Sequence, residues 1–172
     1  VNCAGIGTAA RILPRDGGLP IAEFERTLRI NLIGTYSVLS HAAQGMSTLE
    51  PLADGARGVI INTASVAWQD GQIGQAAYAA SKGGIASLTL PAARELARFG
   101  IRVMAIAPGL FETAMTQTLP EEVRSAISAN IPFPSRLGAP EEYALLVEQI
   151  VTNPFLNGTV IRLDGAVRLQ PR

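Results

Sequence analysis

The sequence predicts an α/β fold built on a parallel sheet, and three observations support this. Residues 58–64 form a run of apolar and β-branched side chains, typical of a strand buried on both faces. A helix rich in small residues follows from about Gln75, and a second apolar strand at 101–107 ends at Pro108-Gly109. Strand, helix and strand in this order form a βαβ unit, in which the two strands run parallel.

Length and composition indicate one domain with a sizeable core. Of the 172 residues, 48% are hydrophobic and only 16% are charged, which excludes a disordered chain. The net charge is zero and there is no basic run, so direct nucleic-acid binding is not predicted. No apolar run approaches eighteen residues, so no membrane span is predicted. The single cysteine excludes an internal disulfide and favours a reducing compartment.

Three side chains of the βαβ unit point to proton-transfer chemistry. Ser65 comes where the first strand ends, at the edge where open α/β sheets bind ligands. Tyr78 and Lys82 are four residues apart, so they share one face of the following helix. A phenol has a pKa of about 10, and a neighbouring cation is expected to lower it toward neutrality. The set can move a proton on and off a substrate oxygen that Ser65 holds.

Lysine usage strengthens this interpretation. The chain contains 14 cationic residues, of which 13 are arginine and one, Lys82, is lysine. A compact ammonium with three donors can serve a phenol and sugar hydroxyls where a planar guanidinium would not fit. An ordinary solvated helix lysine is therefore the weaker interpretation of this position.

The elements before this unit are a strand end, a loop and a long helix. Residues 1–3 read as the end of a strand, and residues 8–20 as a loop with two prolines. The helix is expected over 21–47, with Phe24, Leu28, Leu32 (or Ile33) and Tyr36 on its apolar face. Asn31 lies in its middle although asparagine is a modest helix former. The only histidine, His41, is expected to be structural rather than catalytic.

The elements after the unit are short. Helices are expected to begin near residues 119–123 and 139–142, where proline is followed by acidic residues. A last strand is expected at residues 159–163. Gly83 and Gly84 are expected to allow close approach of a neighbouring element, and Pro91 to kink its helix. Six apolar residues between these elements could line a substrate pocket or form ordinary core: Phe111, Met115, Leu119, Ile127, Phe133 and Leu137.

The motifs resemble the short-chain dehydrogenase/reductase family. Ser65 followed by the Tyr-x-x-x-Lys pattern of Tyr78 and Lys82 is similar to its active site, and Asn31 matches its fourth catalytic residue. Residues 1–5 match its Asn-Asn-Ala-Gly motif, except that Cys3 replaces the second asparagine. Residues 108–113 match its Pro-Gly motif, which lies against the nicotinamide.

The resemblance implies a doubly wound, Rossmann-type parallel sheet. It also implies that residues 1–172 are the C-terminal two thirds of a single domain, with the N-terminal phosphate-binding portion missing. No G-x-x-x-G-x-G turn occurs in the chain. In the family, Asn31 interrupts its helix and relays protons to the lysine.

Longer motifs resemble a subgroup that oxidises 3-hydroxyacyl-CoA thioesters to 3-ketoacyl-CoA with NAD in fatty acid metabolism and isoleucine degradation. These motifs are residues 60–66, 71–78, 105–111, 132–138 and 153–158. The resemblance implies that Tyr78 takes the hydroxyl proton, Ser65 and Gln75 position the substrate, and Lys82 binds the nicotinamide ribose. The implied cofactor-binding residues are Asn2, Cys3, Ala4, Gly5, Tyr78, Lys82, Pro108, Gly109, Phe111 and Thr113, with no metal.

The resemblance also implies an acyl-CoA partner and a homotetramer, in the cytoplasm of a bacterium or the mitochondrial matrix of a eukaryote. Three alternatives stay open: an NADPH-dependent 3-oxoacyl-[acyl-carrier-protein] reductase, a non-catalytic scaffold on the same fold, and a fragment with no activity of its own. The intact serine, tyrosine and lysine argue against the scaffold.

Overall fold

A computed structural model describes residues 1–15, 17–18, 20–113, 116 and 120–171. Its centre is a parallel sheet in the order β1-β2-β3, formed by Gly58–Thr63, Ile101–Pro108 and Val160–Leu163. Asn2 adds a bridge to Asn62 on the free edge of β1. The predicted parallel sheet is confirmed, and the two central strands lie within one residue of their expected bounds.

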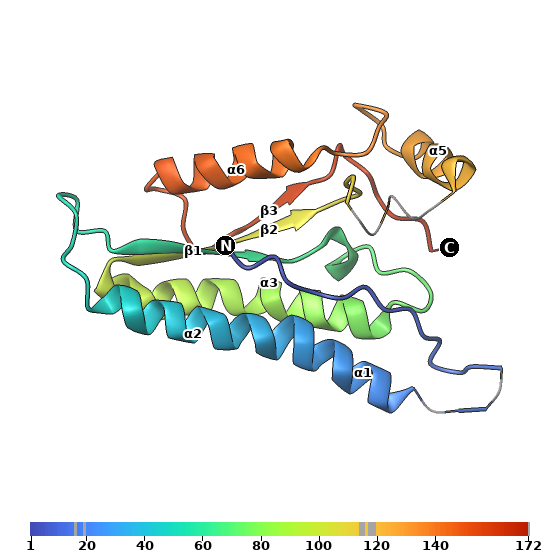
Figure 1. The fold of residues 1–172 in the computed structure, drawn as a ribbon, viewed down its shortest axis with the longest axis horizontal. Helices are drawn as coiled ribbons and strands as arrows, with labels where there is room; N and C mark the ends of the chain where they lie inside the picture. Colours follow the sequence, from blue (N-terminus) through green and yellow to red (C-terminus); the bar gives the residue numbers. More distant parts are fainter. Residues whose placement is uncertain (16, 19, 114–115, 117–119, 172) are drawn as a thin grey trace.

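Helices cover both faces of this sheet (Figure 1). On one face, α2 (Gly34–Ser47) and α3 (Ala76–Leu96) pack against Ile60 of β1 and Val103 of β2. On the other face lies α6 (Pro140–Thr152), whose buried Ile150 contacts Ile61 and Met104. Alternate strand residues therefore face opposite layers, as a doubly wound sheet requires.

The long helix over 21–47 is present but contains an irregular turn. It consists of α1 (Ile21–Leu28), a π-helical segment η1 (Arg29–Ile33) and α2. Asn31 lies at the centre of η1, so the expected helix interruption at this residue is confirmed.

The expected apolar face of this helix is confirmed only in part: Leu28 and Leu32 are half-buried, and Leu32 packs against the core, but the other residues differ. Thr27, Asn31, Thr35, Leu39 and Ala43 are the buried residues, whereas Phe24, Ile33 and Tyr36 are exposed by 39%, 58% and 59%. The π turn carries more residues per turn than an α-helix, so it shifts the buried face relative to a regular 3.6-residue period.

The remaining elements carry the chain around the carboxyl ends of the strands. Two short 3₁₀ turns, η2 (Val66–Trp68) and η3 (Ala97–Phe99), flank α3, and α5 (Glu121–Ala129) lies beyond β2. Helix α3 continues through Pro91 to Leu96. Within the described residues, no helix combines the length and the apolar character needed to cross a bilayer.

Candidate active site

Ser65, Tyr78 and Lys82 meet at the carboxyl edge of the sheet. Ser65 follows β1 and is 8% exposed, and its hydroxyl accepts a hydrogen bond from the Ala67 amide at 3.2 Å. The Ser65 side chain also lies close enough to the Tyr78 hydroxyl to lower its pKa. The Lys82 Nζ lies 5.8 Å from the centre of the Tyr78 ring, one turn along α3. The spacing in the sequence therefore brings these three side chains together as expected.

Lys82 is a buried ammonium fixed by the main chain of β1. Its side chain is 5% exposed, and its Nζ donates to the Thr63 carbonyl oxygen at 2.8 Å. Burial lowers the pKa of Lys82 to about 8, an effect that the electrostatic interaction with Cys3 partly opposes. Lys82 can therefore change its charge close to neutral pH.

The pKa of Tyr78 differs from the expectation. Burial raises it above its ordinary value of 10.0, and the nearby Ser65 side chain lowers it only in part. The predicted lowering by Lys82 is wrong for this structure, because desolvation of the phenol dominates and the ammonium donates to a carbonyl oxygen. Tyr78 is therefore a neutral hydroxyl at pH 7 in this arrangement.

Asn31 is completely buried and joins this site from the irregular turn η1. Its side-chain amide pairs with the main chain of Ile6, accepting from the amide at 2.8 Å and donating to the carbonyl at 2.9 Å. It also donates to the Ser81 hydroxyl at 3.1 Å, which in turn donates to the Tyr78 carbonyl. Asn31 thus links the N-terminal segment to the helix that carries the tyrosine and lysine.

The predicted N-terminal motif lies across the end of β1. Asn2 donates to the buried Asn62 side chain at 2.8 Å, which fixes the segment that contains Cys3 and Ala4. Gly5 lies directly over the site: a Cβ there would be 3.2 Å from Asn31 Oδ1 and 3.6 Å from Lys82 Nζ. The motif therefore borders the lysine, as a cofactor-binding segment must.

The Pro-Gly motif leaves the end of β2. Pro108 pairs with Leu163 of β3, and a Cβ on Gly109 would meet Asp164 at 2.8 Å. Phe111 packs edge-on against Tyr143 with ring centres 6.4 Å apart, and Thr113 is exposed. These predicted cofactor residues thus extend from the same edge of the sheet.

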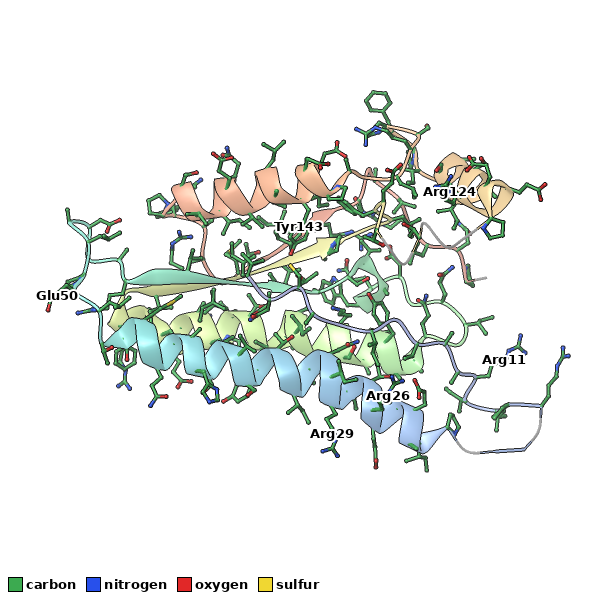
Figure 2. All side chains as sticks on the ribbon, in the orientation of Figure 1. Arg11, Arg26, Arg29, Glu50, Arg124 and Tyr143 are labelled. Carbon is green, nitrogen blue, oxygen red and sulfur yellow. The ribbon has the colours of Figure 1, made fainter. Side chains whose placement is uncertain are left out.

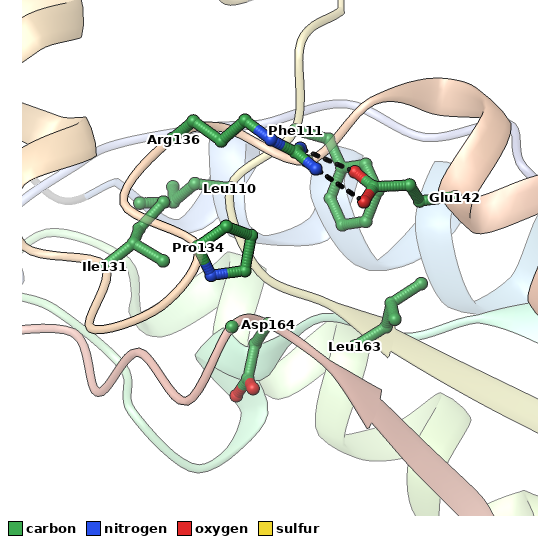
Figure 3. A pocket seen from close by; sticks show the side chains of 10 residues that line it. Leu110, Phe111, Ile131, Pro134, Arg136, Glu142, Leu163 and Asp164 are labelled. Atoms are coloured by element: carbon green, nitrogen blue, oxygen red, sulfur yellow. Dashed lines mark hydrogen bonds and ion pairs between the residues drawn. The ribbon is translucent and has the colours of Figure 1, made fainter.

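A cavity of about 120 Å³ is lined by Phe111 together with Leu110, Ile131 and Pro134 (Figure 3). The Arg136 guanidinium forms two hydrogen bonds of 2.8 Å with the Glu142 carboxylate beside it. Together with a bond from the Ala139 amide, this pair lowers the pKa of Glu142 to about 2. The arrangement ties the segment before α6 to the first turn of that helix.

The proposed pocket residues divide between core and surface. Leu137 and Ile127 belong to a small core with Ile131 and Val167, and Phe133 is 82% exposed. Of the six, Phe111 alone is among the residues that line the cavity of Figure 3, while Met115 and Leu119 lie outside the described residues.

Gln75 precedes α3, three residues before Tyr78. Its side chain exchanges hydrogen bonds with Gln72, which holds the loop before the helix. Among the described residues there is no group of three or more His, Cys, Asp or Glu side chains that could hold a metal ion.

Comparison with known proteins assigns this arrangement to a family, because residues 1–124 match the family described as short chain dehydrogenase. The chain belongs to the short-chain dehydrogenase family. It is 57% identical over 173 aligned positions to the 3-hydroxyacyl-CoA dehydrogenase type-2 of Bos taurus and to that of Homo sapiens. These alignments cover 99% of this chain and 66% of each relative.

Two further relatives of this dehydrogenase family support the fold. The (3R)-3-hydroxyacyl-CoA dehydrogenase of Rattus norvegicus is 36% identical, over 97% of this chain and 61% of the relative. The crystal structure of 3-hydroxyacyl-CoA dehydrogenase type-2 from Mycobacterium avium matches with a TM-score of 0.92 and 44% identity, over 98% of this chain and 65% of that one. The chain thus spans about two thirds of the length of these relatives.

The polar groups at this edge of the dehydrogenase fold fit a nicotinamide ribose. An ammonium offers three donors, of which Lys82 directs one to Thr63, and the Tyr78 hydroxyl lies beside it. Since the chain has no glycine-rich turn of the G-x-x-x-G-x-G type, the fit concerns the nicotinamide half of a dinucleotide.

Sequence reasoning missed two residues of this site, Thr63 and Ser81. Each acts through a contact between distant segments: Thr63 gives Lys82 its acceptor, and Ser81 links Asn31 to the Tyr78 carbonyl. Their positions next to the motif residues were the only signal that the sequence offered.

Proposed function

We propose that this chain carries the catalytic half of an NAD-dependent 3-hydroxyacyl-CoA dehydrogenase. The observation that carries the proposal is the meeting of Ser65, Tyr78 and the only lysine of the chain at the carboxyl edge of a parallel sheet. The names of the relatives, which are 57% identical, support a hydroxyacyl-CoA substrate.

In the proposed reaction, Ser65 holds the 3-hydroxyl oxygen of the substrate against Tyr78. Because Tyr78 is a neutral hydroxyl at pH 7, it must first give up its own proton through Lys82, and the nearby Ser65 side chain favours the phenolate that forms. The phenolate then takes the substrate's hydroxyl proton as the hydride leaves the same carbon, which restores the neutral tyrosine. The cofactor supplies the hydride acceptor. Lys82 relays the proton by losing one to solvent and then accepting one from Tyr78, and its pKa of about 8 suits this exchange close to neutral pH.

Asn31, Gln75 and the two predicted cofactor motifs have supporting roles in this proposal. Asn31 completes the relay next to Lys82, and Gln75 positions the substrate beside Tyr78. The motif residues 2–5 border the cofactor on one side, and residues 108–113 on the other. The pyrophosphate would be held by residues outside these 172, so residues 1–172 form the C-terminal two thirds of one domain.

We further propose a homotetramer in the bacterial cytoplasm or, in a eukaryote, in the mitochondrial matrix. The exposed apolar residues of α1, η1 and α2 support the assembly, since large apolar side chains that stay exposed in one chain are often covered by another subunit. These residues are Ile21, Phe24, Ile30, Ile33, Tyr36 and Val38. The free Cys3 fits a reducing compartment.

The direct test measures NADH formation from 3-hydroxybutyryl-CoA by the purified protein, together with its intact mass. Turnover with NAD is expected, and a preference for NADPH with a 3-oxoacyl thioester on acyl carrier protein would instead support the reductase. If the polypeptide has a mass of 18.1 kDa and neither binds NAD nor turns over, the activity belongs only to a longer parent protein.

Replacing Tyr78 by Phe separates an enzyme from a scaffold. The variant keeps the ring and loses the hydroxyl that carries the proton, so kcat should fall by about 10²–10⁴-fold while the assembly mass stays unchanged. Turnover equal to the wild type would contradict the assigned role of Tyr78. A wild type without turnover on any hydroxyacyl thioester would favour the scaffold.

A further inference from the structure

Tyr143 of α6 reaches the site from the opposite face of the sheet. Figure 2 shows its side chain between α6 and the strands. The Tyr143 hydroxyl lies 2.7 Å from the Thr63 hydroxyl at the end of β1, and 4.0 Å from the Cys3 sulfur. Its ring packs edge-on against Phe111. One side chain thus contacts three segments that surround the proposed cofactor.

The contact with Thr63 leads directly to Lys82. The main-chain oxygen of Thr63 accepts the hydrogen bond from Lys82 Nζ at 2.8 Å, while the side-chain oxygen of the same residue bonds Tyr143. Thr63 is the last residue of β1, and the main chain on both sides of its carbonyl is held: the Thr63 amide donates to the Asn2 carbonyl oxygen at 3.1 Å and the Ala64 amide to the Ile106 carbonyl oxygen of β2 at 2.8 Å. The bond between the Thr63 and Tyr143 hydroxyls adds a side-chain restraint to the same residue from the α6 face of the sheet.

Packing alone does not require the Tyr143 hydroxyl. A phenylalanine would fill the same space next to Phe111 and would need no polar partner. Burial raises the pKa of Tyr143, so its hydroxyl stays neutral and acts as a fixed hydrogen-bonding group. The hydroxyl has two neighbours, and both Thr63 and Cys3 belong to the edge that borders Lys82.

We propose that Tyr143 is a positioning residue, which orders Thr63 so that the Thr63 carbonyl holds the Lys82 ammonium in the place that the proposed dehydrogenase reaction needs. The inference rests on the proposed function for its catalytic meaning. Its geometry can be tested without turnover.

The single lysine makes a direct test possible. Lys82 is the only lysine of these 172 residues, so in ¹³C-lysine-labelled protein its signal is identified by its loss in Lys82→Arg, and the titration of that signal reports the pKa of Lys82. In Tyr143→Phe we expect this pKa to fall by about half a unit, because a less ordered carbonyl stabilises the ammonium less. Cys3 and Tyr78 are the other titratable groups beside Lys82, so their titrations are followed in the same samples.

Variants at Thr63 test whether Tyr143 acts on Lys82 through Thr63. Thr63→Val removes the hydroxyl but keeps the carbonyl, and should lower the Lys82 pKa by the same amount as Tyr143→Phe. The double variant should lower the Lys82 pKa no further than Thr63→Val alone, since that change already removes the bond to Tyr143 together with the 3.5 Å bond of the Thr63 hydroxyl to the Cys3 sulfur. Thr63→Ser keeps the hydroxyl and should restore the wild-type value. Tyr36→Phe is the matched control. Tyr36 is exposed on α2, so the loss of its hydroxyl should leave the pKa of Lys82 unchanged.

An unchanged or raised Lys82 pKa in both single variants, or shifts that add in the double variant, would overturn the positioning role. If Tyr143→Phe does not fold, the Thr63 variants decide the question alone. A wild type without turnover would overturn the proposed function but leave this titration valid. Turnover with no shift of the Lys82 pKa would overturn the positioning role only.

Discussion

Gly5 shows how closely the N-terminal motif fits over the site. Since a Cβ at this position would lie 3.2 Å from Asn31 Oδ1, Gly5→Ala should displace the asparagine or the segment itself. A displacement of a few tenths of an ångström in a proton relay is expected to reduce kcat at least ~10-fold. Steady-state kinetics would measure this effect.

The matched control is Gly45→Ala in α2, where a Cβ would meet nothing within 4 Å. This change should leave kcat unchanged and stabilise the helix slightly. Equal kinetics for Gly5→Ala and the wild type would show that residues 5 and 31 are not rigidly coupled.

Lys82 makes the stability of the protein depend on pH. Its pKa is about 8 in the folded protein against 10.5 ordinarily, so between these values the unfolded chain binds more protons and stability rises with pH. Below pH 8 the buried ammonium is charged in both states, and its burial costs up to about 3 kcal/mol.

Lys82→Met removes this dependence. The free energy of unfolding of the variant, relative to the wild type, should be highest below pH 8 and should decrease as the pH rises toward 10.5. The unpaired Thr63 carbonyl adds a constant offset that does not alter this trend. Urea unfolding across the range measures it, and a difference independent of pH would show that the lysine is not buried as a cation.

Residue types and spacings predicted much of the site. Ser65 ends a strand and Tyr78 and Lys82 lie one helical turn apart, so local geometry was enough to bring them together. The roles of Thr63 and Ser81 could not be predicted, because they depend on which main-chain oxygens lie within reach after folding. The pKa of Tyr78 was predicted wrongly, since burial cannot be read from spacing.

At the scale of the helix, the neighbouring glycines of α3 differ in their surroundings. A Cβ on Gly84 would lie 2.7 Å from the Leu32 side chain, whereas a Cβ on Gly83 would meet nothing within 4 Å. The expected close approach therefore concerns Gly84, which lets α3 contact η1.

Gly84→Ala should consequently destabilise the protein by ~1–3 kcal/mol through overpacking. Gly83→Ala should stabilise it by up to ~1 kcal/mol, because alanine is the better helix former. Thermal unfolding of the two variants gives the comparison. A stabilised Gly84→Ala variant would mean that Leu32 can move aside freely.

The strands were easier to predict than the faces of the long helix. Strands β1 and β2 are short apolar runs with clear ends, and their composition alone identifies them. The buried face of the helix over 21–47 carries threonines and Asn31, while several large apolar side chains point outward. Hydrophobic periodicity assigns such a helix only in part, with Leu32 inside but Phe24 and Tyr36 exposed, since it assumes that every apolar side chain faces the core of the same chain.

For the whole molecule, this outward apolar surface predicts an assembly. Ile33→Glu places a charge in the exposed apolar stretch of η1 and should reduce the oligomer mass measured by light scattering. Leu52→Glu, at a 69% exposed loop residue, is the control and should leave the mass unchanged. A mass unchanged in Ile33→Glu would exclude this surface as a subunit contact.

The π turn at residues 29–33 makes the site sensitive to the number of residues in its helix, independently of their chemistry. Each residue of an α-helix turns the chain by about 100° and advances it by about 1.5 Å. Deleting one residue beside Asn31 would convert the π turn into regular α-helix and rotate everything before it by that angle. A homologue with a one-residue gap here would keep every motif but would present a different face of the helix to Ser81. An alignment that ignores single gaps could therefore assign this homologue an active site that it does not form.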